Sequence, residues 1–216
     1  AEYISKLCTK IQNFTRKNYL QEENSNKFCG MLVLIDLLGT LAFAISGASK
    51  AIYYKLDWLG LLVMAIVTGV GGGITRDLLL GSTPPLALQN PNYIMVCIAG
   101  AFLTLIVEKR FRFFMKLTLI IDALGLGFFT AVGASKAAQM DSSALTIVLL
   151  AMITAAGGGL IRDLLVSEIP QVLRSDFYAT AALLGGLLFL ALENTSYSFS
   201  TQILITTFFT FVIRII

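Results

Sequence analysis

The sequence predicts an all-α membrane protein with seven transmembrane helices, and three observations lead to this prediction. Hydrophobic residues make up 56% of the 216 residues and charged residues only 13%, whereas soluble domains carry about 25% charged residues. Apolar stretches that approach the ~20 residues of a bilayer-spanning helix recur along the chain. Two blocks of sequence also return after a fixed interval, which indicates an internal repeat.

Charged residues, prolines and asparagines divide the apolar part of the chain into segments. The seven helices are expected at 30–53, 58–80, 91–108, 116–138, 143–166, 176–193 and 201–216. The polar tail over residues 1–28 shows no apolar core after a short basic region, so it does not read as a signal peptide and is expected to be partly helical or disordered. Residues 29–216 are therefore expected to form a single transmembrane domain.

The repeat relates the first three helices to the next three. Segment 36–50 returns as 122–136, and the same interval of 86 residues (36 to 122) relates 68–79 to 154–165. Three is an odd number of helices, so the second unit must cross the membrane in the opposite sense, as an inverted repeat. Repeat 1 covers about 30–110 and repeat 2 about 116–195, with the helix at 201–216 outside both. The alternative is an ancestral duplication whose symmetry has no present function.

The first helix of each repeat carries a polar stripe. Positions spaced by 3, 4, 4 and 3 residues fall on one helix face. These positions are Asp36, Gly39, Phe43, Gly47 and Lys50, and they return as Asp122, Gly125, Phe129, Gly133 and Lys136. A carboxylate inside an apolar helix costs about 2.5–3.5 kcal/mol on insertion scales, so the aspartates are candidates for a transport pathway. Helix packing, with the lysine reaching toward the interface, is the alternative. The adjacent Ser49 and Ser135 could line the pathway or bond to their own helices.

The second helix of each repeat carries three consecutive glycines near its middle. They are Gly71, Gly72 and Gly73, and Gly157, Gly158 and Gly159. Each glycine costs about 1 kcal/mol relative to alanine in a helix, so three together are expected to weaken or break the helix. Freed backbone groups would then face a polar pathway at mid-membrane. The alternative is a notch for a close helix crossing.

An arginine–aspartate pair follows each glycine triplet. The pairs are Arg76–Asp77 and Arg162–Asp163. Because neighbouring residues do not face each other on a helix, each is expected to find a partner elsewhere, with Arg76 reaching a carboxylate of the other repeat. These groups could line the pathway or fix the register between the repeats as buried ion pairs.

Other classes of function lack support in the sequence. Histidine is absent, and the three cysteines at positions 8, 29 and 97 show no CxxC spacing, so we expect no metal site, no cofactor and no enzyme activity. A net charge of +3 is too small and dispersed to indicate nucleic-acid binding. Lysines and arginines near the helix ends favour an outside N-terminus and a cytoplasmic C-terminus.

The paired motifs resemble one known family. Segments 46–50, 71–77 and 157–163 resemble the prokaryotic branch of the trimeric intracellular cation (TRIC) channels. That branch is also described as a bacterial inner-membrane family (UPF0126-type) assigned as glycine transporters. The resemblance covers about residues 30–216. It implies two inverted three-helix repeats, a final helix, a homotrimer, a separate pore in each protomer, and glycine-kinked helices beside that pore.

Two functions fit these residues. The first is a channel for potassium or another monovalent cation, with weak discrimination against sodium because no TVGYG-like filter is present. The second is a carrier for glycine or another small zwitterion, with its carboxylate against an arginine and its ammonium against an aspartate. Membrane lipid and further copies of the chain are the expected partners, without nucleic acid.

Overall fold

The computed structural model describes residues 22–108, 114–174, 177–195 and 197–216. Every element in these ranges is a helix. Two of the helices are single turns of four residues, α4 and α8. The elements are α2 (Glu22–Tyr53), α3 (Trp58–Leu79), α4 (Leu86–Gln89), α5 (Asn92–Glu108), α6 (Phe114–Gln139), α7 (Ala144–Leu165), α8 (Gln171–Arg174), α9 (Ala179–Glu193) and α10 (Phe199–Ile215).

The helix boundaries lie close to those expected from the sequence, with one exception. From α3 onward each long helix begins and ends within three residues of its expected position. Helix α2 instead begins at Glu22, eight residues before position 30, and so takes in part of the polar tail. The expectation for residues 1–21 of that tail lies outside the described residues. The short helices α4 and α8 lie in the breaks between the expected transmembrane helices, each just after a proline, Pro85 and Pro170.

The long helices have the length and composition of a membrane protein. Four are long and apolar enough to cross a bilayer, at Gly30–Tyr53, Trp58–Leu79, Leu117–Gln139 and Ala144–Leu165. Three shorter apolar helices accompany them, at Asn92–Val107, Ala179–Glu193 and Phe199–Ile215. Large hydrophobic side chains are exposed along the outside of the bundle, as expected for a surface in contact with lipid. The predicted all-helical membrane protein is confirmed at this level.

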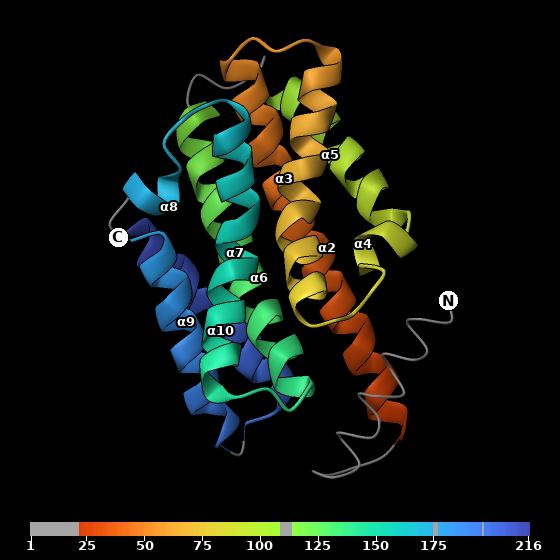
Figure 1. Ribbon diagram of the computed structural model, residues 1–216, viewed down its shortest axis with the longest axis vertical. Helices are drawn as coiled ribbons and strands as arrows, with labels where there is room; N and C mark the ends of the chain where they lie inside the picture. The colour runs from red at the N-terminus through yellow and green to blue at the C-terminus, as the bar shows by residue number, and fades with distance from the viewer. Residues whose placement is uncertain (1–21, 109–113, 175–176, 196) are drawn as a thin grey trace.

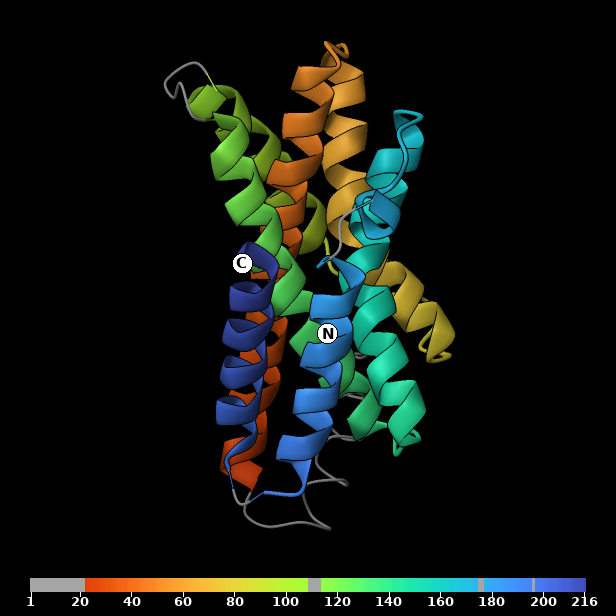
Figure 2. The ribbon, with the colours of Figure 1, turned by 90° about the vertical axis from the view of Figure 1, so that its left-hand side faces the viewer.

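The four longest helices form the centre of the bundle. Helix α2 packs against α3 and α6, and α3 and α6 each pack against α7. Helix α5 covers α2 and α3, α9 covers α7 and α6, and α10 lies against α6 and α9 (Figures 1 and 2). In Figure 1 the chain runs upward in α2 and downward in α6, and downward in α3 and upward in α7. Equivalent helices of the sequence repeat are therefore antiparallel.

The glycine triplets do not break their helices, so the expectation of interrupted helices was wrong. Helices α3 and α7 continue through both triplets. A Cβ on Gly72 would lie 2.3 Å from the carbonyl oxygen of Thr154, and one on Gly158 would lie 2.4 Å from that of Thr68. The glycines thus form the notch in which the backbones of α3 and α7 cross. This close packing offsets the low helix propensity of glycine.

Two glycines of the stripe, Gly39 and Gly125, serve a similar crossing between α2 and α6, whereas Gly47 lies against α3 and Gly133 against α7. The rings of Phe43 and Phe129 meet at the centre, with centroids 5.2 Å apart. Phe129 lies over Gly39, where a Cβ would come within 2.8 Å of the ring, and Phe43 lies over Gly125 at 3.4 Å. The packing interpretation of these glycines is therefore the one that the structure supports.

Candidate functional site

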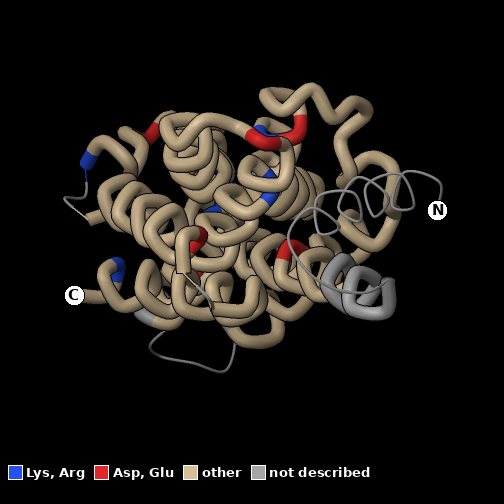
Figure 3. Tube along the Cα trace, turned by 90° about the horizontal axis from the view of Figure 1, so that it is seen from below, with Lys and Arg blue, Asp and Glu red and all other residues tan. Residues whose placement is uncertain are grey.

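The charged residues of the repeat gather in two groups inside the bundle. The first cluster consists of Asp36, Arg76, Asp77 and Lys136. The second cluster consists of Asp122, Arg162, Asp163, Lys50 and Glu168. Except for Lys50 and Glu168, all of these residues are buried. Seen along the bundle, several charged positions lie on the sides of the helices that face the middle of the bundle (Figure 3).

Arg76 is the centre of the first cluster. Its Nη1 and Nη2 donate to the two oxygens of Asp36 at 3.0 and 3.3 Å, and its Nε donates to Asp77 Oδ1 at 2.8 Å. Lys136 Nζ lies 3.3 Å from Asp77 Oδ1 and 3.9 Å from Asp36 Oδ2. A guanidinium held by two carboxylates in this way is fixed in one orientation.

Two neutral donors complete the first cluster. The hydroxyl of Tyr93, at the start of α5, donates to Asp36 Oδ2 at 2.8 Å. The backbone N–H of Leu86, at the start of α4, donates to Asp77 Oδ2 at 3.0 Å. The short helix α4 is thereby joined to the end of α3, and both carboxylates accept hydrogen bonds at both oxygens.

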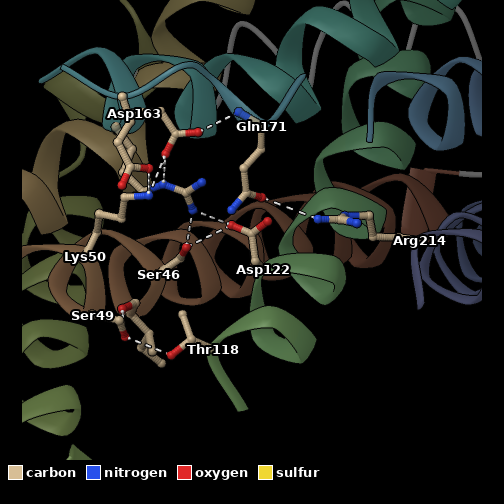
Figure 4. A network of polar contacts seen from close by, with 11 residues as sticks. Ser46, Ser49, Lys50, Thr118, Asp122, Asp163, Gln171 and Arg214 are labelled. Atoms are coloured by element: carbon tan, nitrogen blue, oxygen red, sulfur yellow. Dashed lines mark hydrogen bonds and ion pairs between the residues drawn. The ribbon is translucent and has the colours of Figure 1, made fainter. Parts of the chain in front are cut away.

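Arg162 occupies the same place in the second cluster. Its Nη1 donates to Asp122 Oδ1 at 2.7 Å, and its Nε donates to Asp163 Oδ1 at 2.9 Å. The hydroxyl of Ser46, from α2, also donates to Asp122 Oδ1 at 2.8 Å, and Arg162 Nη1 contacts the same hydroxyl oxygen. Figure 4 shows Ser46 and Asp122 pointing toward each other from different helices.

The second cluster extends to the edge of the bundle through Lys50. Lys50 Nζ lies 3.5 Å from Asp163 Oδ1 (Figure 4). It also pairs with Glu168, to which the Tyr54 hydroxyl donates as well. Asp163 Oδ2 accepts from the backbone N–H of Gln171 at 2.8 Å, as Asp77 does from Leu86. Arg214 of α10 donates to the side chain of Gln171 at 3.3 Å.

The pairing differs from the sequence prediction in two respects. Arg76 pairs with Asp36 of its own repeat, and the ion pairs between repeats are made by the lysines, Lys136 to Asp77 and Lys50 to Asp163. The neighbouring residues Arg76 and Asp77 also bond directly. Adjacent residues point to different faces of a helix. The arginine side chain is nevertheless long enough for its Nε to reach the carboxylate of the next residue.

The first cluster is balanced in formal charge, and the second carries one excess carboxylate, which Arg214 offsets from beside it. The first contains two cations and two carboxylates. The second contains two cations and three carboxylates, with Arg214 attached through Gln171. Burial of unpaired charges would cost several kcal/mol per ion, roughly, whereas pairing and hydrogen bonding recover much of this cost. Both clusters can therefore remain ionised inside an apolar bundle.

The predicted serines and the last glycine of each triplet lie beside the clusters but outside their ion pairs. The hydroxyl of Ser49 donates to Ile45 O at 2.7 Å, and that of Ser135 donates to Val132 O at 2.9 Å, so both bond to their own helices. A Cβ on Gly73 would lie 3.6 Å from Arg76 Nη2, and one on Gly159 would lie 3.7 Å from Arg162 Nη2. The last glycine of each triplet thus faces the arginine of its own repeat.

Several residues at the site were not predicted from the sequence. Tyr93, Tyr178, Glu168 and Arg214 contact or adjoin the clusters, and Ser46 was noted only as part of a motif. The two tyrosines could have been found from the sequence, because both stand at the start of the third helix of a repeat. Their separation is 85 residues (93 to 178), one less than the interval of the repeat, so a comparison at that interval does not align them. Among the described residues, no group of three or more acidic or cysteine side chains is placed to hold a metal ion.

The stability of the protein is expected to depend on pH through Glu168, at the edge of the second cluster. Hydrogen bonds from Lys50 and then Tyr54 lower the pKa of Glu168 below its ordinary value of 4.5, and the same contact raises the pKa of Tyr54 to about 12. A carboxyl with a lowered pKa stabilises the fold above its ordinary pKa and loses this contribution as the pH falls through the lowered value. The melting temperature of Glu168→Gln should therefore lie below that of the unmodified chain at pH 7. The gap should narrow as the pH falls below 4.5 and should close once the pH is below the lowered pKa of Glu168.

The matched control for Glu168 is Asp141→Asn, which alters an exposed carboxylate in the turn between α6 and α7. Its melting temperature should follow that of the unmodified chain over the same pH range. A gap for Glu168→Gln that stays constant down to acidic pH would contradict the assigned contacts.

Comparison with known proteins identifies the family. A family model described as "Glycine transporter" matches residues 33–109 and 119–194. A UPF0126 membrane protein of Vibrio cholerae is 41% identical over 186 residues, which cover 86% of this chain and 78% of that protein. The UPF0126 inner membrane protein YadS of Escherichia coli K12 is 37% identical over 170 residues, covering 78% of this chain and 81% of YadS.

Solved structures show the same relationship. The TRIC trimeric intracellular cation channel orthologue from Rhodobacter sphaeroides superposes with a TM-score of 0.81 at 34% identity, covering 86% of this chain and 95% of that one. A prokaryotic TRIC channel crystallised in 0.5 M KCl gives a TM-score of 0.80, also at 34% identity, over 86% and 94% of the two chains. The chain belongs to the TRIC/UPF0126 family.

Membership of the TRIC/UPF0126 family confirms two expectations from the sequence. The resemblance drawn from the glycine and arginine–aspartate motifs is correct. The relatives are membrane channels and transport proteins rather than enzymes, so the prediction of a non-enzymatic protein is also correct. The two matched segments, 33–109 and 119–194, correspond closely to the two units of the sequence repeat.

Proposed function

We propose that the chain is a channel for monovalent cations, chiefly potassium, with a separate pore in each protomer of a homotrimer. The observation that carries this proposal is the likeness to solved TRIC channels at 34% identity over 86% of the chain. The position of the charged clusters supports it, because the helices of one protomer supply all their members. A polar route built from these groups needs no second copy of the chain.

The pathway in this proposal follows the two clusters. Asp36, Asp77 and Lys136 surround Arg76 beside the middle of α2, and Asp122, Asp163 and Lys50 surround Arg162 near its C-terminal end. Within residues 71–73 and 157–159, Gly72 and Gly158 hold α3 against α7, and Gly73 and Gly159 face the arginines. Ser49 and Ser135 stand beside the lysines, with their hydroxyls bonded to their own helices. Carbonyls freed by a broken helix have no part in this route, because α3 and α7 are continuous.

The proposed topology has seven spans in a bacterial inner membrane. The antiparallel course of α2 and α6, and of α3 and α7, supports two inverted repeats with α10 as an additional span (Figure 1). The distribution of lysine and arginine near the helix ends supports an N-terminus outside and a C-terminus in the cytoplasm. The exposed apolar surface would contact membrane lipid and the other two protomers.

The clusters also bear on selectivity. Each is close to neutral in formal charge, and a ring of carbonyls like that of potassium-selective filters is absent from the sequence motifs. A cation that passes such groups keeps most of its hydration. We therefore expect little discrimination between potassium and sodium.

A carrier for glycine or another small zwitterion is the second candidate. The description of the matching family model favours it, as does the juxtaposition of Arg162 and Asp122, whose side chains each keep one atom without a hydrogen-bond partner. Such a pair offers a donor to a carboxylate and an acceptor to an ammonium group.

Reconstitution in liposomes distinguishes the two candidates. Potassium flux down a gradient without valinomycin and uptake of labelled glycine are measured on the same preparation, with protein-free liposomes as the control. We expect a conductive potassium flux that is proportional to the driving force and unchanged by glycine, with a sodium flux of similar size. Saturable glycine uptake without current would instead establish the carrier and refute the channel.

A further inference from the structure

One side chain connects the helix outside the repeat with the second cluster. Helix α10 packs against α6 and α9, and Arg214 stands in its last turn. Arg214 Nη2 donates to the side-chain oxygen of Gln171, in α8, at 3.3 Å. The guanidinium carbon of Arg214 lies 4.9 Å from the centroid of the ring of Tyr178, which is the N-cap residue of α9. Arg214 therefore contacts both α8 and the start of α9.

Gln171 is bonded to the second cluster as well as to α10. Its backbone N–H donates to Asp163 Oδ2 at 2.8 Å, and its side chain accepts from Arg214 (Figure 4). The other oxygen of Asp163 lies 2.9 Å from Arg162 Nε and 3.5 Å from Lys50 Nζ. Because both of its oxygens have partners, the carboxylate of Asp163 is held in one orientation. The position of α8 therefore determines how Asp163 faces its two cations.

The equivalent short helix of the first repeat is held by apolar packing. Asp77 Oδ2 accepts from the backbone N–H of Leu86, in α4, at 3.0 Å. The side chains of Leu86 and Ala87 are buried, so the hydrophobic effect fixes α4 against the bundle. Helix α8, whose four residues are all described, has no buried residue, and Val172 packs only in part against the core. Polar contacts must therefore supply what apolar burial supplies to α4.

Arg214 is turned toward the protein to make this contact. An arginine near the end of an apolar helix commonly extends its charged group toward the lipid headgroups. Arg214 is instead half-buried, and its Nε is enclosed without a hydrogen-bond partner among the described residues. Figure 4 shows its side chain reaching from α10 toward Gln171. The guanidinium group thus holds α8 and the ring of Tyr178 together from one side.

We infer that Arg214 is a positioning residue for the second cluster, because it fixes α8 and so keeps the backbone N–H of Gln171 on Asp163. The helix outside the repeat is in this way coupled to the ion pair between Asp163 and Lys50. The consequence for transport rests on the proposed channel function, whereas the positioning of α8 does not. Without Arg214, Asp163 would lose its fixed orientation and neutralise Lys50 less well. A less neutralised lysine would repel cations from the route.

Hydrogen–deuterium exchange of the full chain in detergent, read by mass spectrometry, tests the positioning. The amides of Gln171 and Leu86 form a matched pair, because each follows a proline, begins a four-residue helix and donates to the aspartate of its own repeat. In Arg214→Ala, we expect the peptide with Gln171 to exchange several-fold faster and the peptide with Leu86 to exchange as before. Unchanged exchange at Gln171 would overturn the inference. Equal acceleration of both peptides would also overturn it, because Arg214 would then act on the whole fold.

Two further variants test whether the effect passes through the side chain of Gln171. Gln171→Leu removes the acceptor and keeps the backbone N–H, so it should accelerate exchange at position 171 as much as Arg214→Ala does. The double variant should then add nothing further, and Arg214→Lys, which keeps a donor, should restore part of the protection. Additive effects of the two substitutions would overturn the assignment. If Arg214→Ala fails to fold, unchanged exchange in Gln171→Leu would still overturn it.

Potassium flux in liposomes tests the consequence for transport separately. Arg214→Ala should lower the flux several-fold, and Arg214→Lys should lower it less. Arg174→Ala, which removes the exposed arginine of α8, should leave it unchanged. The loss in Arg214→Ala should be greater in dilute KCl, because salt screens the repulsion by the lysine. A flux equal to that of the unmodified chain would overturn the transport part of the inference.

Failure of the channel function itself would give a different result. Absence of flux from every protein, including the unmodified chain, would refute the channel and with it the transport part of the inference. The exchange rates at Gln171 and Leu86 would still decide whether Arg214 positions α8.

Discussion

Gly158→Ala is expected to destabilise the protein strongly. A methyl group at this position would lie 2.4 Å from the carbonyl oxygen of Thr68, which belongs to the backbone of α3 and cannot move aside as a side chain could. Overpacking of a well-packed core costs about 1–3 kcal/mol and sometimes more, and a backbone contact belongs at the upper end of this range. Thermal unfolding in detergent, followed by circular dichroism, should show a large decrease in the melting temperature.

The adjacent Gly157 provides the control for this prediction. A Cβ at Gly157 would lie 3.4 Å from the Cα of Gly72, which is an ordinary contact. Gly157→Ala should therefore be tolerated, and the higher helix propensity of alanine would favour it by up to about 1 kcal/mol. Equal melting temperatures for Gly157→Ala and Gly158→Ala would contradict a notch at Gly158 and would favour flexibility of the whole triplet.

The helices could be predicted from the sequence, because a bilayer imposes a length and a composition on each of them. The boundaries of α3 and α7 follow from charged or polar breaks on either side of an apolar run. The stripe containing Asp36 and Lys50 could also be read, since helical spacing alone places its members on one face. These features depend only on neighbours along the chain.

The function of the glycine triplets could not be predicted, because it depends on a partner from elsewhere in the chain. The low helix propensity of Gly72 is a local property, whereas the carbonyl of Thr154 that requires it belongs to the other repeat. The ion pairs present the same difficulty. Nothing local to Arg76 indicates that Asp36 is close enough to pair with it, or that the lysines make the ion pairs between repeats.

The tyrosines show how a small change in register escapes a search for repeats. Aligned by the interval of the repeat, Tyr93 faces Ala179 and Tyr178 faces Asn92, so neither tyrosine is a repeated position. In the structure both stand beside the arginine of their own repeat, and only Tyr93 reaches the carboxylate. A search for repeated residues therefore misses side chains that take similar places in the two halves of the structure.

Arg76→Ala is expected to cost about 3–5 kcal/mol of stability, the range for breaking a buried ion pair by removing one partner. The substitution would leave Asp36 and Asp77 in an apolar bundle, with Lys136 as the remaining nearby cation. Arg76→Lys should recover only part of this stability, because an ammonium group cannot bond both oxygens of Asp36 as the guanidinium does. Chemical unfolding of the purified protein in detergent measures these differences.

Arg174→Ala serves as the control, because Arg174 is exposed on the short helix α8, and substitutions at such surface positions usually change stability by less than about 0.5 kcal/mol. The double variant Asp36→Asn/Arg76→Gln should be more stable than Arg76→Ala, since it removes the unpaired carboxylate together with its partner and keeps hydrogen-bonding groups in place. If the double variant were instead less stable than Arg76→Ala, uncompensated charge would not be the source of the loss. The cost would then arise from the packing of the arginine side chain between α2 and α3.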